Sequence, residues 1–444
     1  MNEKLNDALN EIRDEYIDEA AKAKKRRPYW FGAVAAVLAV VIIWWAIGNP
    51  IITAKAVALA DYSEGDRRTY YESTHTYINN LSGFFADSIS QVLSGSNGEN
   101  AAYSPVNLYL GLAAVAELTG GDEQILATLE AKDLESLRKM STALWNVSYE
   151  DDGDQCLLAS SVWLDNDLSY DQTVMDSLAQ HHYTSVYQGN FGSSRTNRDI
   201  SNWLNKQTGN LLKDSADGID LDPHTVFALY STIYYQAKWS DEFSAAENSQ
   251  GPFHAPGGDI TCTYMNKDKI SGYYFWGEDF GAVTLLLKDG SRMWLILPDE
   301  GKTVDDVLCA GEYAGMFLGD GVWENCKDMY INLSIPKFDI RANGDLKEDL
   351  QAMGITDVFD RDKADFSAAM PDFNDPVWLS SVNQATRVAI DEKGVTAASY
   401  IEFPGAGAAA PPEDTIDFIL DRPFIFLVTN YLSVPLFAGV VNEP

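Results

Sequence analysis

The sequence predicts an α+β protein, and the order of its segments supports that class in two ways. After residue 69, apolar residues recur at helical spacing in the earlier segments, whereas β-branched and aromatic runs dominate the later ones. Strands and helices do not alternate regularly, as they would around a parallel sheet. No long Pro- or Ser-rich linker and no repeat interrupts residues 69–444, so we interpret this stretch as one domain.

Four segments carry the signals of a helix. Residues 77–93 place apolar side chains three to four positions apart. Ser104-Pro105 precedes a long apolar run and has residue types that open helices. We also expect helices over 201–212 and over 345–353, each with its first residue, a serine and an aspartate, as the cap.

Runs of β-branched and aromatic residues predict the strands. Two of them, 282–287 and 292–297, flank Asp289-Gly290, which is a strong signal for a hairpin turn. The other predicted strands are 225–235, 330–340, 424–429 and 436–441.

The charge of the chain is strongly acidic. Residues 1–27 hold equal numbers of acidic and basic side chains, so the whole net charge of −34 belongs to the remainder. Nucleic acid, a polyanion, is therefore excluded as a partner of that larger part, whereas a cationic partner would be attracted to it. Solubility alone would explain the acidity equally well.

The four cysteines do not indicate a metal site. Cys156, Cys262, Cys309 and Cys326 form no CxxC pair and lie near no histidine at metal-ligand spacing, so we expect neither a metal nor a cofactor. Two disulfides and four buried thiols are both compatible with the sequence.

Motifs of catalysis are absent from the sequence. It contains no GxSxG elbow, no HExxH and no Walker loop. The adjacent His181 and His182 would point to opposite sides of a strand, and we expect them to be surface residues. The sequence therefore favours a protein that is not an enzyme, although a hydrolase assembled from scattered residues stays a third alternative.

Residues 29–48 are expected to span a membrane, because they contain no charged side chain. A helix of this length rises about 1.5 Å per residue and spans about 30 Å, the thickness of a hydrocarbon core. Basic residues gather at 22–27, which places residues 1–28 in the cytoplasm and the remainder outside the cell. A cleaved signal peptide would have a shorter apolar core and a small-residue cleavage site. We interpret 49–68 as a spacer. The predicted topology of the chain is compatible with a single-pass bacterial surface protein.

Several segments, in the same order along the chain, resemble the serpin family. They are Ser104-Pro105 with the apolar run after it, YYQAKW at 234–239, the stretch 336–366, RVAIDEKGVTAA at 387–398, and the C-terminal stretch 421–444. Together they extend over residues 69–444. The resemblance implies a fold of three β-sheets with about nine helices and an exposed reactive-centre loop, the bait loop, over about 394–414.

The resemblance also implies a mechanism in which the chain traps a serine protease. The protease attacks the bait loop and forms an acyl-enzyme, and the cleaved loop then inserts as a new strand into the main sheet. The inhibitor needs no base or nucleophile of its own, in agreement with the missing motifs. We expect a monomer that binds a protease.

Insertion demands that every second side chain of the hinge enter a packed interior. If Val395 points inward, strand alternation sends Ala397, Ser399 and Ile401 inward too, and all are small or apolar. The hinge residues implied by the resemblance are Glu392, Gly394, Val395, Thr396, Ala397, Ala398 and Ser399.

Counting from the hinge places the scissile bond at Ala408-Ala409. The flanking candidates Ala406, Gly407 and Ala410 are equally small, so the target would have a small primary pocket, as elastase-like and subtilisin-like proteases do.

Control of sheet opening is implied for Ser104, Ser231 and Gln384. Serine and glutamine stand at the last two positions, where the family commonly shows asparagine and histidine. Tyr400 and Pro404 favour the alternative of a non-inhibitory serpin-fold module that is cleaved as a plain substrate, since proline removes a ladder hydrogen bond.

Overall fold

The computed structural model describes residues 52–60, 81–96, 98–151, 155–208, 219–318, 323–395 and 412–444. The chain divides into two compact units, Met1–Ile51 and Ile52–Pro444, and the fold below is that of the second. Within the described ranges no helix is long and apolar enough to cross a membrane. The expected span, 29–48, lies outside those ranges.

Nine α-helices form in the described ranges, which confirms the expected number. They are α4 (Ser82–Leu93), α5 (Pro105–Leu118), α6 (Glu123–Thr128), α7 (Leu134–Ser148), α8 (Gln172–His181), α9 (Ser194–Gln207), α11 (Val304–Ala310), α12 (Gly315–Leu318) and α13 (Lys347–Ala352). Short 3-10 turns occupy Ala245–Glu247, Glu312–Ala314 and Asp357–Phe359.

Six of the described α-helices begin at a side-chain cap. The Ser104 hydroxyl accepts the Asn107 amide hydrogen and Pro105 opens α5, as the sequence predicts. The cap of α9 is Ser193 and not Ser201, because the hydroxyl of Ser193 accepts from the Thr196 amide, about two turns before Ser201.

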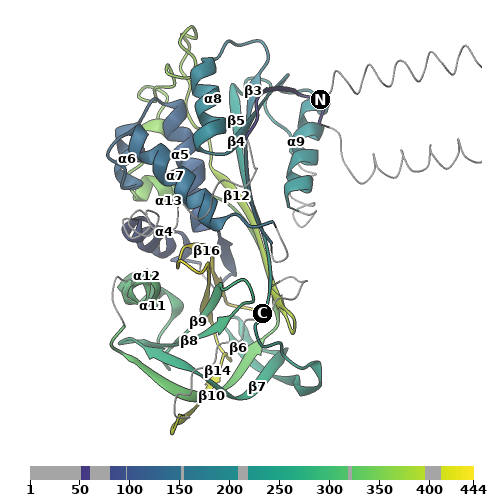
Figure 1. The fold of residues 1–444 in the computed structure, drawn as a ribbon, viewed down its shortest axis with the longest axis vertical. Coiled ribbons are helices and arrows are strands. Elements are labelled where there is room, and N and C mark those ends of the chain that lie inside the picture. The colour runs from purple at the N-terminus through teal and green to yellow at the C-terminus, as the bar shows by residue number, and fades with distance from the viewer. Residues whose placement is uncertain are drawn as a thin grey trace, which may run out of the picture. The chain divides into compact units, whose positions relative to one another are not determined.

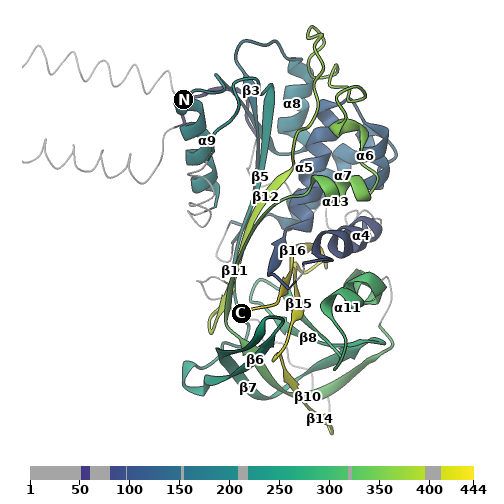
Figure 2. The same ribbon diagram turned by 180° about the vertical axis from the view of Figure 1, so that it is seen from behind.

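A seven-stranded sheet is the first of two sheets. Its order is β1-β4-β3-β5-β13-β12-β11. The strands are β1 (Lys55–Ala58), β4 (Thr184–Gly189), β3 (Gln155–Asp165), β5 (Phe227–Lys238), β13 (Gly394–Val395), β12 (Asn383–Asp391) and β11 (Phe338–Asp345). Helices α5, α7 and α8 lie on one face and α9 on the other, as both views show (Figures 1 and 2).

The second sheet has nine strands. Its order is β14-β10-β7-β8-β9-β15-β16-β2, with β6 also paired to β7. The strands are β14 (Thr415–Ile419), β10 (Cys326–Pro336), β7 (Gly258–Trp276), β8 (Phe280–Leu286), β9 (Arg292–Pro298), β15 (Phe424–Thr429), β16 (Pro435–Val441), β2 (Ala101–Tyr103) and β6 (Ser249–Ala255). The 19-residue β7 pairs with β6, β10 and β8, so the described ranges contain two hydrogen-bonded sheets instead of three.

The first strand comes from the stretch 49–68 that we interpreted as a spacer. Lys55 and Ala56 pair with Gln188 and Tyr187 of β4, at the outer edge of the seven-stranded sheet. The Thr53 hydroxyl donates to the Asp199 carboxylate of α9 at 2.7 Å, and Asp199 is buried. Residues 52–58 of that stretch are thus part of the folded unit.

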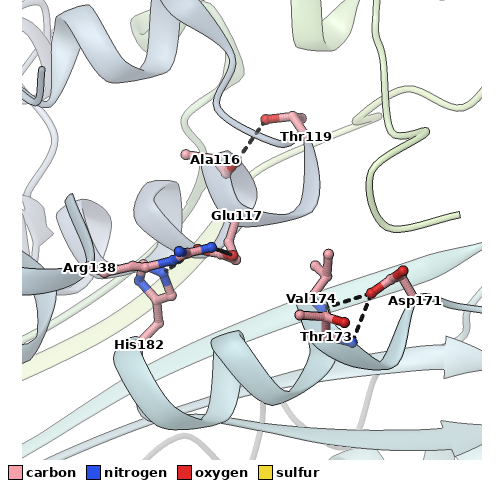
Figure 3. A network of polar contacts seen from close by, with 8 residues as sticks. All are labelled: Ala116, Glu117, Thr119, Arg138, Asp171, Thr173, Val174 and His182. Atoms are coloured by element: carbon pink, nitrogen blue, oxygen red, sulfur yellow. Dashed lines mark hydrogen bonds and ion pairs between the residues drawn. The ribbon is translucent and has the colours of Figure 1, made fainter. Parts of the chain in front are cut away.

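A buried ionic cluster joins the three helices that cover one face of the seven-stranded sheet (Figure 3). Glu117 at the end of α5 accepts from the Arg138 guanidinium of α7 and lies 3.1 Å from His182 Nε2, just after α8. Burial alone would raise the pKa of Glu117, but the hydrogen bonds from His182 and Arg138 outweigh it and lower that pKa to about 2. His182 is therefore a buried residue and not the surface residue that we expected.

Candidate functional site: the hinge and the strands it enters

The first residues of the predicted bait loop already form a strand. Gly394 and Val395, which make up β13, pair antiparallel with Lys238 and Ala237 of β5. On their other side they pair antiparallel with β12. Val395 is buried in the core, in the inward orientation that the hinge argument requires. The chain thus enters the seven-stranded sheet between β5 and β12.

Glycine is required at position 394 because the backbone of β5 passes directly beside it. A Cβ atom built on Gly394 would lie 2.3 Å from the Ala237 carbonyl oxygen and 2.6 Å from Lys238 Cα. Its φ of 156° is also uncommon for residues with a side chain. Any larger residue would push β13 away from β5.

Glu392 fixes the turn that precedes β13. Its carboxylate forms an ion pair with Lys337 and accepts a hydrogen bond from Asn248 Nδ2 at 2.6 Å. The Lys337 ammonium and the Asn248 amide lower the pKa of Glu392 to about 2. The Glu392 carbonyl also accepts from the Phe243 amide at 2.9 Å. The hinge therefore starts from a fixed point.

The three residues expected to control sheet opening lie around the first turn of α5. Gln384 of β12 accepts from the Ser104 amide at 2.7 Å through its side-chain oxygen, and its side-chain nitrogen donates to the Ser104 carbonyl. Ser231 of β5 donates its hydroxyl to Asn107 Oδ1 and lies 3.0 Å from the hydroxyl of Ser160. The start of α5 thus holds both strands that would separate.

β5 and β12 meet directly in no register pair of the described residues. Among the described residues, the sheet connects them through the two residues of β13. Beyond Val395 a cavity of about 200 Å³ lies between the two strands, lined by Tyr235 of β5 and Val388 of β12 among others. The facing edges of β5 and β12 consequently offer backbone groups to a strand placed between them.

Several predicted site residues lie outside the described ranges. These are Thr396, Ala397, Ala398, Ser399, Ala406, Gly407, Ala408, Ala409 and Ala410. Of the residues that hold the hinge and the strands in place, sequence reasoning missed Asn107, Ser160, Lys337 and Asn248. Asn107 follows the capping Ser104 by one turn, which was a usable signal, but nothing local marks the other three.

The described residues contain no cluster that could hold a metal ion. All four cysteines are free thiols, and Cys309 is exposed. The structure therefore favours thiols over disulfides, but only Cys156 of the four is buried.

A family profile described as Serpin (serine protease inhibitor) matches residues 80–444. Because the match covers most of the chain, the protein belongs to the serpin family. Its relatives in that family are protease inhibitors and not enzymes, which confirms the corresponding expectation from the sequence.

Curated relatives come from animals and plants. Alpha-1-antiproteinase of Callosciurus caniceps is 26% identical over 405 residues, covering 86% of this chain and 92% of its own. Serpin-ZX of Arabidopsis thaliana is 23% identical, with 79% and 93% covered. Plasminogen activator inhibitor 1 of Sus scrofa is 24% identical, with 89% and 99% covered.

Solved structures share the fold. The thermophilic serpin Tengpin in its native state has a TM-score of 0.71 at 23% identity, covering 89% of this chain and 99% of its own. AtSerpin1 of Arabidopsis, in its native stressed conformation, has a TM-score of 0.70 at 22% identity, with 86% and 99% covered. These similarities confirm the serpin fold expected from the sequence.

Proposed function

We propose that this chain inhibits serine proteases with a small primary pocket, elastase-like or subtilisin-like, by inserting its cleaved bait loop between β5 and β12. The observation that carries the proposal is β13, because its two residues already pair with both strands. The cavity beyond Val395 and the unpaired edges of the two strands support the same route.

The register of β13 assigns a partner to each residue that would follow it. Counting onward from Val395 opposite Ala237 and Ile390, Ala397 would meet Tyr235 and Val388. Both of these are buried, and they line the cavity. A methyl group fits such a place, whereas a long charged side chain would have to be buried without a partner.

Two arginine substitutions separate insertion from plain cleavage. Ala397→Arg would place a charge in the inward row, whereas its neighbour Ala398→Arg would face outward. We expect Ala398→Arg and the unchanged chain to give a band at the summed mass with elastase that survives boiling in denaturant. Ala397→Arg should be cleaved near Ala408 without that band.

The same gel tests the alternative, a serpin-fold module cleaved as a substrate. Rapid cleavage of the unchanged chain with no stable band and a fully active protease would favour that alternative. The full chain in a mild detergent is the appropriate material, since Thr53 and β1 belong to the folded unit.

The scissile bond is proposed at Ala408-Ala409. An arginine on the amino side of this bond suits trypsin-like enzymes, so Ala408→Arg should transfer inhibition from elastase to trypsin. Sequencing the peptide released by elastase from the unchanged chain locates the bond directly. Release that begins outside 407–411 would contradict the proposed register.

We further propose that residues 29–48 anchor the chain in a cell membrane, with residues 1–28 in the cytoplasm and the serpin domain outside. The uncharged run and the bases before it support this topology. The exposed thiol of Cys309 is a built-in probe. A membrane-impermeant maleimide should label it on intact cells. A chain with Asn6→Cys in which Cys262, Cys309 and Cys326 are all replaced by serine should be labelled only after lysis, because the remaining Cys156 is buried, and labelling before lysis would contradict the topology.

A further inference from the structure

One open face of the second sheet adjoins the point where the bait loop returns to the fold. We call it the exit face and define it by Tyr273 of β7, Asp328 and Tyr330 of β10, and Thr415 and Asp417 of β14. Asp328 is the register partner of Tyr273, and Thr415 is that of Tyr330. Partners across a ladder and every second residue along a strand share one side of a sheet, so these five side chains do too.

The exit face is exposed, whereas the opposite side of the same strands is core. Ile331, Leu333 and Phe418, which alternate with exit-face residues, are all buried. Tyr273 is 56% exposed, although it is a large aromatic residue in the middle of a sheet. Ile419, further along the same side of β14, is 45% exposed. Exposed aromatic and aliphatic side chains gathered on one face are typical of a binding surface.

The bait loop ends beside this face. The Tyr330 amide donates to the Asp414 carbonyl at 2.8 Å, and Lys327 forms an ion pair with the Asp414 carboxylate. Asp414 follows the proposed scissile bond by a few residues, at most about 20 Å of extended chain. A protease domain measures about 40 Å across. A protease bound at Ala408-Ala409 would therefore come within reach of the exit face.

The charge of the face favours one kind of partner. Asp328 and Asp417 lie on it, and Glu413 and Asp414 stand at its border. Two lysines stand at the border. Lys327 is paired with Asp414, and Lys269 lies in β7 four residues before Tyr273. Acidic groups around an exposed tyrosine match a surface rich in arginine and lysine.

We propose that the exit face is a second docking surface for the target protease, which contacts it through a basic surface next to its active site. The inference rests on the proposed function, because that function supplies the partner. It goes further, since it assigns partner selection to residues outside the bait loop.

The test compares rates at which a basic elastase consumes the intact full-length chain, whether the product is a trapped complex or a cleaved chain. Tyr273→Ala should slow consumption about fivefold or more at low salt, as expected for loss of an aromatic anchor. Asp328→Asn should weaken the salt dependence of the rate. The controls are Tyr431→Ala, also exposed but in the turn between β15 and β16, and Glu135→Gln on α7. Both should leave the rate unchanged.

The outcomes separate the docking surface from the trap. A slower Tyr273→Ala chain that still traps the usual fraction of protease supports the exit face. If the unchanged chain is only cleaved, without a trapped complex, and Tyr273→Ala is cleaved more slowly, the exit face is supported and the trap is overturned. Equal rates for Tyr273→Ala, Tyr431→Ala and the unchanged chain overturn the exit face. If elastase neither traps nor cleaves the unchanged chain, both proposals are overturned.

Discussion

Gly394 is the residue at which the chain passes from an ordinary turn into the space between two strands. The Ala237 carbonyl lies where a side chain would begin. We predict that Gly394→Ala lowers the free energy of unfolding by about 1–3 kcal/mol and displaces β13, because a methyl group must separate β13 from β5. Urea unfolding measures the change. Gly344→Ala is the matched control, since a Cβ there meets nothing within 4 Å.

Glu392 makes the hinge sensitive to acid. Its folded pKa of about 2 lies below its ordinary value, so its stabilisation is fully present above the ordinary pKa and is lost as the pH falls through the folded pKa. We predict that Glu392→Gln destabilises the chain by about 1–2 kcal/mol at neutral pH and much less near pH 2. Unfolding at a series of pH values checks this. A difference that is the same at every pH would contradict it.

At the scale of elements, the Glu117 cluster connects α5, α7 and the end of α8 on one face of the seven-stranded sheet. We predict that Glu117→Gln costs about 3 kcal/mol, because Arg138 and the buried His182 lose their common charged partner. The comparison is Glu135→Gln, which breaks an exposed pair with Lys139 on the surface of α7. It should change stability little. Equal losses in the two variants would mean that burial of the cluster contributes nothing.

The sequence predicted those elements whose signals are local. The start of α5 needs only Ser104 and Pro105, and the β8–β9 hairpin needs only its Asp-Gly turn and the apolar runs around it. The predicted cap of α9 was wrong, because Ser201 is the same residue type as the true cap, Ser193. The run 330–340 was interpreted as one strand, but it is divided at Lys337 between β10 and β11.

Other features depend on partners that are far away in the sequence. His182 is buried because Glu117, on another helix, lies beside it. The strand at 55–58 has only four residues, too few to show a strand pattern in the sequence. It forms because it pairs with β4, which is far away in the sequence. The family resemblance supplied Ser104, Ser231 and Gln384. Asn107, which accepts a hydrogen bond from Ser231, was missed although it follows the capping Ser104 by one turn.

At the scale of the whole molecule, the net charge of −34 should act on the rate of encounter with a target. We predict that association with a basic elastase slows about tenfold or more between ~10 mM and ~150 mM salt, because screening shortens the reach of the acidic surface. Stopped-flow or discontinuous inhibition assays measure the rate. The uncharged peptide spanning 403–412 should be cleaved at a rate that salt hardly changes. An equal salt effect on peptide and protein would contradict steering.

Because β13 runs antiparallel to β5, the length of the uncut bait loop limits how far it can insert. Inserted strand from residue 396 to 405, at about 3.3 Å per residue, would advance about 33 Å toward the Phe227 end of β5. Residues 406–414, fully stretched at about 3.5 Å each, reach about 32 Å and would also have to cover the separation between β13 and β14. An uncut loop therefore cannot complete the ladder while Asp414 stays bonded beside Tyr330. Full insertion therefore requires either that a peptide bond of the loop breaks or that β14 separates from β10. The number of residues between β13 and Asp414 is what prevents the uncut loop from completing the sheet.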